Sequence, residues 1–83
     1  MTKGKIAGFE GHHIIPVKEL VGTKYEYLIA SLKNIVFLPK ADHVYVHRFG
    51  DTIEATKDRL IEKRPDIAKT IKKLLKTIGK RLK

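Results

Sequence analysis

Two short apolar runs stand out in the first half of the chain. One covers residues 13–17, contains the β-branched pair Ile14 and Ile15, and has Pro16 near its end. The other covers residues 35–38, with the sequence IVFL, and a proline follows it directly. Because β-branched residues favour strands and proline is confined to their ends or edges, both runs predict short buried strands.

Helical spacing follows between and after the two runs. In residues 25–32, with the sequence YEYLIASL, apolar side chains recur every three or four positions, which predicts a short helix. Asp42 is a suitable N-cap for a helix that reaches Phe49, and Asp51 is a suitable N-cap for its continuation. The proline within residues 64–66 disfavours helix in the residue before it and therefore predicts a boundary.

Apolar residues in the second half form helix faces. The continuation after Asp51 is expected to bury Ile53, Leu60 and Ile61. The last helix has one apolar stripe with lysines on its other side, the pattern of an amphipathic helix that packs on a core or a partner. The stripe consists of Ile67, Ile71, Leu74, Leu75, Ile78 and Leu82. The predicted order is strand, short helix, strand and then helices, after a flexible lead-in over residues 1–8.

The composition excludes several classes of protein. The chain has 83 residues, enough for a single domain, and 42% hydrophobic residues, enough for a modest core. It contains no cysteine, so disulfides, thiolate metal sites and cysteine nucleophiles are excluded. No apolar run reaches the roughly 18 residues of a membrane span, and the N-terminal segment lacks the apolar region of a signal peptide.

The charge of the chain is strongly positive. Lys and Arg number 18 against 9 acidic residues, which gives a formal net charge of +9. Half of the basic residues lie in the last quarter of the chain. A field of this sign favours a polyanion: nucleic acid, an acidic membrane surface or an acidic protein. The charge run alone fits a solubilising basic face equally well.

All four histidines lie in two places, and the second place has helical spacing. His43 and His47 are four positions apart, so on a helix their Cβ atoms lie about 5–6 Å apart on one face. That geometry allows two imidazoles to bind one divalent metal ion. For this pair alone, two partly exposed histidines on an amphipathic turn are the simpler interpretation.

The first place holds two adjacent histidines, His12 and His13. Neighbours on a strand point to opposite faces, so the two side chains are expected to have different roles. One could join His43 and His47, because three neutral imidazoles hold a divalent ion and leave coordination positions open. The other would then be free to act as a general base near neutral pH. The alternative is one buried and one exposed structural histidine.

Together these residues resemble a known family. GHHIIPV at 11–17, NIVFLP at 34–39 and the HxxxH pair resemble the motif of the HNH (ββα-metal, His-Me finger) nucleases. The likeness is greatest to colicin-type DNases and to the GHH/AHH-type nuclease domains of bacterial polymorphic toxins. It implies an α+β fold: a small ββα-metal core of two short antiparallel strands and a metal-binding helix, with additional helices that include a basic C-terminal helix. Residues 1–83 would form one domain, with the motif core at 9–49 and a helical extension at 51–83.

The resemblance also implies a role for each matching residue. His13 matches the general base that activates water, and His12, His43 and His47 match the metal ligands. Asn34 matches the asparagine that braces the loop between the two strands and keeps the base in place. The implied cofactor is one divalent ion, Mg, Mn, Ni or Zn; imidazole suits the last three better than magnesium, which prefers oxygen ligands.

Two further residues have weaker matches. Glu10 stands where the colicin-type enzymes have an acid that orients an arginine, although only Lys3 and Lys5 precede it here. Arg48 follows the last histidine and matches a contact to the scissile phosphate. The stretch between the strands departs from the colicin pattern, because it lacks the glycine- and aspartate-rich sequence. The residues expected to contact nucleic acid are Lys40, Arg48, Lys69, Lys72, Lys73, Lys76 and Lys80.

The implied function is that of a metal-dependent, largely sequence-non-specific endonuclease that hydrolyses phosphodiester bonds in DNA, with RNA left open as a substrate. Such domains are the toxic parts of bacterial effectors or bacteriocins. The resemblance thus implies delivery from the producing bacterium into the target-cell cytoplasm, and an acidic immunity protein as partner. One alternative is a non-catalytic basic nucleic-acid-binding module with a structural metal site. Another is a membrane-active or partner-binding segment at residues 67–82, which would leave the first half of the chain without a role.

Overall fold

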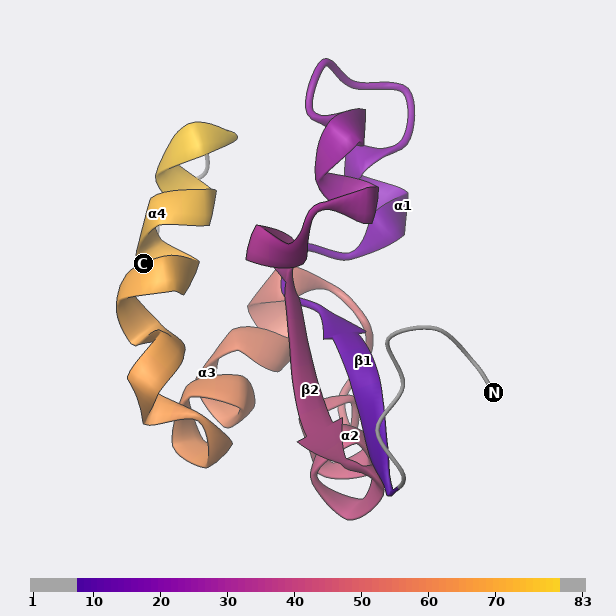
Figure 1. The fold of residues 1–83 in the computed structure, drawn as a ribbon, viewed down its shortest axis with the longest axis vertical. Helices are drawn as coiled ribbons and strands as arrows, with labels where there is room; N and C mark the ends of the chain where they lie inside the picture. The colour runs from indigo at the N-terminus through magenta and orange to yellow at the C-terminus, as the bar shows by residue number, and fades with distance from the viewer. Residues whose placement is uncertain (1–7, 80–83) are drawn as a thin grey trace.

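Two antiparallel strands and four α-helices make up residues 8–79, the residues that the computed structural model describes (Figure 1). The elements are β1 (Phe9–His13), α1 (Val17–Leu20), β2 (Ile35–Pro39), α2 (Lys40–Val46), α3 (Ile53–Lys63) and α4 (Ala68–Thr77), with 3₁₀ helices at Glu26–Ala30, Leu32–Asn34 and Pro65–Ile67. The expected α+β fold, a strand pair followed by helices, is therefore confirmed. Lys80, Leu82 and residues 1–7 of the lead-in lie outside the described residues.

The register of the strand pair decides which side chains reach α2. His12 lies opposite Val36, and Glu10 lies opposite Leu38. Directly opposed residues of an antiparallel pair share a face, and Val36 and Leu38 are buried. This face packs against α2 (Figure 1). His13 falls on the other face, as the alternation of a strand requires.

The first strand lies over Phe9–His13, so the prediction over residues 13–17 is wrong in its bounds. Ile14 and Ile15 are both fully buried, whereas consecutive strand residues would alternate between core and surface. The backbone of this segment is held by Asn34: its carbonyl accepts from Ile14 N–H at 2.8 Å, and its side-chain Oδ1 accepts from Ile15 N–H at 2.8 Å. The two isoleucines are thus core residues of a braced loop.

The helix predicted over residues 25–32 is also different. The segment forms two 3₁₀ helices, Glu26–Ala30 and Leu32–Asn34, separated by Ser31 in an extended conformation. Leu28 is buried, and Tyr25 and Ile29 pack against the core, so the apolar spacing does mark an inward face. A single turn of tight helix presents that face without needing a full α-helix.

Two predicted N-caps are wrong. α2 begins at Lys40 with Pro39 as its N-cap, and it ends at Val46 rather than Phe49, so Asp42 lies in its first turn. The N-cap of α3 is Thr52, whose Oγ1 accepts from the backbone N–H of Ala55 at 3.1 Å. Asp51 is instead engaged by the ammonium of a lysine from α1.

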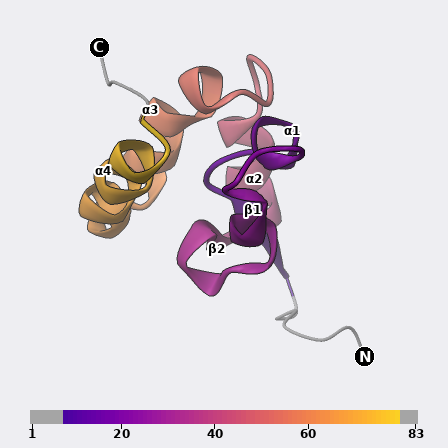
Figure 2. The ribbon, with the colours of Figure 1, turned by 90° about the horizontal axis from the view of Figure 1, so that it is seen from above.

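The C-terminal elements follow the predicted pattern. α3 ends at Lys63, and the 3₁₀ helix Pro65–Ile67 separates it from α4 as the proline predicts. Ile71, Leu74 and Leu75 of α4 are buried in the same core as the hairpin, α2 and α3. Both views place α4 on the side of the molecule away from α1 (Figures 1 and 2). No helix within residues 8–79 is long and apolar enough to cross a membrane.

Candidate metal centre

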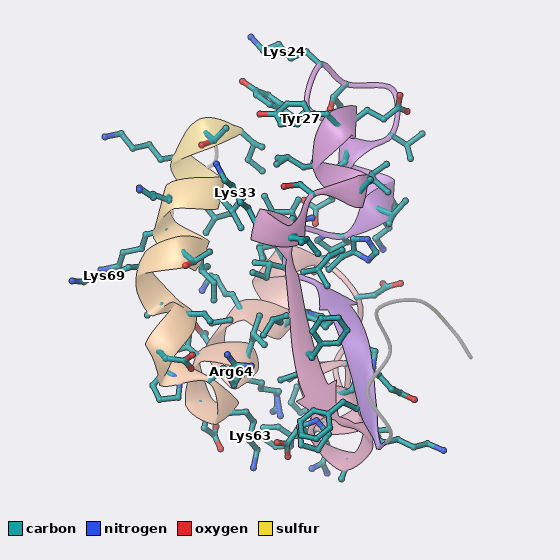
Figure 3. All side chains as sticks on the ribbon, in the orientation of Figure 1. Lys24, Tyr27, Lys33, Lys63, Arg64 and Lys69 are labelled. Carbon is teal, nitrogen blue, oxygen red and sulfur yellow. The ribbon has the colours of Figure 1, made fainter. Side chains whose placement is uncertain are left out.

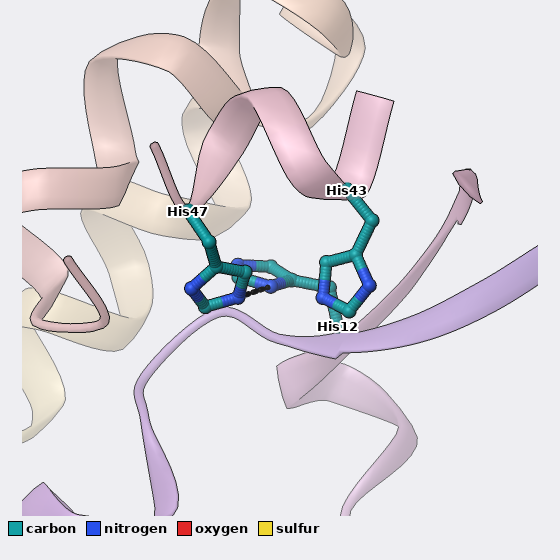
Figure 4. A group of neighbouring side chains, drawn as sticks. All are labelled: His12, His43 and His47. Carbon is teal, nitrogen blue, oxygen red and sulfur yellow. Dashed lines mark hydrogen bonds between the residues drawn. The ribbon is translucent and has the colours of Figure 1, made fainter. Parts of the chain in front are cut away.

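Three histidines from β1 and α2 meet between that strand and that helix (Figure 4). His12 comes from β1, His43 from the middle of α2, and His47 from the C-cap of the same helix. One ring nitrogen from each lies within 4.8 Å of the others. The ring centroids are 4.9–5.2 Å apart. We call these residues the histidine triad.

The triad lies close enough together to bind one metal ion. Ligand nitrogens around a tetrahedral zinc ion stand about 3.3 Å from one another, given metal–nitrogen distances near 2.0–2.1 Å. His47 Nε2 and His12 Nδ1 are already 3.1 Å apart, within hydrogen-bond distance. The separations reach 4.8 Å at most, so the three nitrogens lie close to that spacing.

His12 is kept neutral by its surroundings. Its side chain is buried, at 2% exposure, and burial is the largest cause that lowers its pKa from 6.5 to about 3, followed by the neighbouring His47, His43 and His13. Its Nε2 atom is buried and has no hydrogen-bond partner among residues 8–79. A buried imidazole that stays neutral keeps a lone pair on one ring nitrogen, as binding to a divalent cation requires.

Glu10 fixes the orientation of a second member of the triad. Its Oε1 lies 2.7 Å from His43 Nδ1, so that Nδ1 carries the proton and donates to the carboxylate. His43 therefore keeps Nε2 as the nitrogen with a free lone pair. A carboxylate behind a ligand histidine is the usual way in which proteins hold such rings and raise their basicity. The resemblance matches Glu10 to an acid that orients an arginine, whereas in the structure Glu10 orients His43 of the triad.

His13 stands outside the triad but faces the same cleft. Its Nε2 lies 2.9 Å from the carbonyl oxygen of Ile29. A carbonyl only accepts, so Nε2 carries the proton and Nδ1 keeps its lone pair. A cleft of about 470 Å³ is lined by both His13 and the histidine triad. Its lining residues are Gly11, His12, His13, Pro16, Val17, Lys18, His43, His47 and Asp51.

Asn34 braces the segments on both sides of His13. Its side chain is fully buried, and its Oδ1 accepts from Ile15 N–H. Its Nδ2 donates to the carbonyl of Ile15 at 3.1 Å and to that of Leu28 at 3.3 Å. Leu28 directly precedes Ile29, whose carbonyl holds His13. Asn34 thus joins the loop after β1 to the turn that orients His13.

The basic residues expected to contact nucleic acid are exposed but do not line the cleft. Lys40 begins α2, and Arg48 lies two residues beyond its end, where the Arg48 guanidinium is 5.8 Å from the ring centroid of Phe49. The described lysines of α4 are exposed, and Figure 3 shows Lys69 pointing away from the hairpin. These α4 residues are Lys69, Lys72, Lys73 and Lys76. None of the expected contacts within residues 8–79 belongs to the cleft that holds the triad.

Sequence reasoning missed two charged residues of the cleft, Lys18 and Asp51. Lys18 belongs to α1, a helix of four residues that is too short for a periodic pattern. Pro16, which stands at its N-cap, was the available signal, since proline is common at helix starts.

No protein-family model matches the chain, and comparisons with curated proteins and with solved structures found no match.

Acid should destabilise the metal-free protein through His12. Its pKa is lower in the folded protein than the ordinary 6.5, so the folded state binds fewer protons, and stability is lost as pH falls from 6.5 towards 3. We expect a loss of about 1.4 kcal/mol per pH unit from this group within that window. Urea unfolding in a chelator, between about pH 7 and about pH 4.5, would measure it against His12→Asn. Equal slopes for the two proteins would contradict the assignment.

Proposed function

We propose that this protein is a metal-dependent endonuclease of the HNH class that hydrolyses phosphodiester bonds in DNA with little sequence specificity. The observation that carries the proposal is a fourth imidazole in the cleft of the triad. His13 is outside the triad, and its bond to the Ile29 carbonyl leaves Nδ1 as a free base. A purely structural metal site needs no such group, whereas hydrolysis needs a base beside the metal.

The residues of the cleft divide the work of hydrolysis. His12, His43 and His47 would hold the ion, and Glu10 keeps His43 in the tautomer that leaves Nε2 for it. A divalent ion held there would supply Lewis-acid stabilisation of the negative charge that develops on the phosphate during hydrolysis.

His13 would act on the attacking water. Its Nδ1 takes a proton as the water oxygen bonds to phosphorus, while the bond from phosphorus to the 3′ oxygen breaks. The leaving oxygen then takes a proton from solvent. The Ile29 carbonyl holds the ring through Nε2, so that the basic nitrogen keeps its direction during the reaction.

The ligand set bears on which metal is bound. Three neutral imidazoles suit manganese, nickel and zinc, whereas magnesium prefers oxygen ligands. We propose that one of the first three binds more tightly than magnesium. Magnesium stays a candidate for the ion that supports turnover, because the ion bound in a cell depends on the abundance of each metal as well as on its affinity for the site.

We further propose that the domain is the toxic part of a bacterial effector or bacteriocin and acts in the cytoplasm of the target cell. An acidic immunity protein would protect the producing cell. The support for this partner is the net charge of +9, together with the resemblance of the motif. Co-expression with candidate acidic proteins from the same source, scored by cell survival, tests it.

A second candidate function is a non-catalytic nucleic-acid-binding module with a structural metal ion. The exposed lysines of α4 favour it, because they lie outside the cleft and could bind phosphates without any chemistry. It predicts that DNA is bound and never cut.

Cleavage of supercoiled plasmid separates the two. Purified protein is incubated with plasmid in chelator and then with magnesium, manganese, nickel or zinc in excess. We expect nicked circles with at least one metal and none in chelator. A plasmid that is shifted in a gel but stays supercoiled with every metal, together with intact RNA in the same series, would favour the binding module.

A further inference from the structure

Two charged residues share the cleft with the triad and have no role in the proposed hydrolysis. Lys18 Nζ donates to Asp51 Oδ1 at 2.9 Å, and both side chains line the cleft. The pair is exposed, at 55% for the Lys18 side chain and 68% for that of Asp51. The cleft therefore contains the Lys18 ammonium group, which is paired with the Asp51 carboxylate.

The backbone around this pair is fixed independently. Glu19, next to Lys18, accepts from the backbone N–H of Ile53 at 3.0 Å through Oε2. This bond joins α1 to the first residue of α3, and Asp51 lies in the connection that leads into α3. The positions of α1 and of this connection are thus held without the Lys18–Asp51 contact. Breaking that contact needs only side-chain rotation.

Asp51 also lines the cleft that holds His43 and His47. Its pKa is lowered chiefly by the hydrogen bond and the charge of Lys18. The carboxylate is therefore ionised at neutral pH. A negative charge at this point of the cleft opposes the entry of a polyanion, and Lys18 attracts one only after it leaves Asp51.

We infer that Lys18 binds a phosphate of the nucleic-acid strand within the cleft, and that Asp51 occupies its ammonium in the free protein in place of that phosphate. The exchange costs little free energy and gains a new interaction. An exposed ion pair contributes little, so Asp51 is displaced at small cost and remains solvated. The lysine gains a charge-assisted hydrogen bond to a phosphate oxygen.

This inference rests on the proposed function, because it takes nucleic acid as the ligand of the cleft. It adds two residues that the nuclease motif does not contain: Lys18, which binds substrate, and Asp51, which weakens that binding. Lys18 is then a substrate-binding residue, whereas Asp51 acts only through Lys18. The effect of Asp51 on DNA binding should therefore depend on the presence of Lys18, and an experiment can detect that dependence.

The test measures binding of a fluorescent double-stranded DNA oligonucleotide by anisotropy, in chelator so that no cleavage occurs. The proteins compared are the wild type, Lys18→Gln, Asp51→Asn and the double variant. Lys18→Gln should weaken binding roughly threefold to fivefold and lower the slope of log Kd against log salt by about 1. Asp51→Asn should strengthen binding by roughly the same factor.

Two matched variants control for net charge. Asp58→Asn removes one exposed negative charge from α3, and Lys24→Gln removes one exposed positive charge, and neither residue lines the cleft. Asp51→Asn should exceed Asp58→Asn in effect, and its gain should disappear when Lys18 is already Gln. Thermal unfolding of every variant should stay close to that of the wild type, because Glu19 still holds α1 to α3.

The outcomes separate this inference from the proposed function. A gain for Asp51→Asn that equals that of Asp58→Asn, or that persists in the Lys18→Gln background, would overturn the exchange. So would a Lys18→Gln protein that binds like Lys24→Gln. If the binding results contradict the exchange but the wild type still cleaves plasmid, only the inference about Lys18 and Asp51 is overturned, and the proposed nuclease function stands. A wild type that neither binds nor cleaves DNA or RNA overturns both.

Discussion

Replacing His13 by alanine should lower the rate of metal-dependent plasmid cleavage by roughly 10²–10⁴-fold, the contribution of a general base. The metal affinity should stay nearly unchanged, because His13 is not one of the three residues that converge on the metal centre. Initial rates of nicking measure the first quantity. Calorimetric titration with manganese or zinc measures the second.

The matched control for His13→Ala is His47→Ala, which removes a triad ligand instead of the base. This variant should lose both cleavage and high-affinity metal binding, since two imidazoles remain. A His13→Ala protein that cleaves at the wild-type rate would refute the base assignment. A His13→Ala protein that loses metal binding as fully as His47→Ala would show that His13 helps to hold the triad and does not act as the base for the attacking water.

Replacing Asn34 by leucine should destabilise the protein by roughly 3–5 kcal/mol. The two side chains are similar in size, but leucine leaves the buried backbone partners of the amide without hydrogen bonds. These partners are the N–H and carbonyl of Ile15 and the carbonyl of Leu28. Each buried polar group left unpaired costs about 1–3 kcal/mol. Urea unfolding at neutral pH measures the loss.

Ser31→Ala provides the control for Asn34→Leu. Ser31 lies in the same turn and accepts one hydrogen bond, from the N–H of Lys33 at 3.2 Å, in an exposed position. Because Ser31 is the N-cap of the 3₁₀ helix Leu32–Asn34, its replacement should cost about 1 kcal/mol, well below the loss expected for Asn34→Leu. If Asn34→Leu were as mild as Ser31→Ala, water or backbone adjustment would be satisfying the backbone groups that bond to Asn34.

The sequence predicted the order of the elements but misplaced the first strand, for a physical reason. β1 has the sequence FEGHH, which has no apolar alternation. Its pairing is set by the opposite strand and by contacts to α2, so local propensity pointed instead to Ile14 and Ile15. The proline boundaries were predictable because proline acts through its own backbone. The helix α1 was missed because four residues are too few for a periodic signal.

The spacing of residues along the sequence predicted the candidate site better than it predicted the bounds of the helices and strands. The separation of His43 and His47 by one helical turn placed both rings on one face, and strand alternation separated His12 from His13. The contact between Glu10 and His43 depends on the register and on the packing of α2 against β1. One signal was available: Glu10 and His12 are two positions apart and so share a strand face.

The position of the triad in the chain has a consequence for the lifetime of the protein. His12 and His47 are 35 residues apart, so an ion held by both would close a long loop in a chain that has no cysteine. A covalent cross-link over such a loop removes about 4 kcal/mol of chain entropy from the unfolded state. The ion would thus serve this domain as a removable cross-link. Where metal is scarce the chain would open more often and be degraded by proteases sooner.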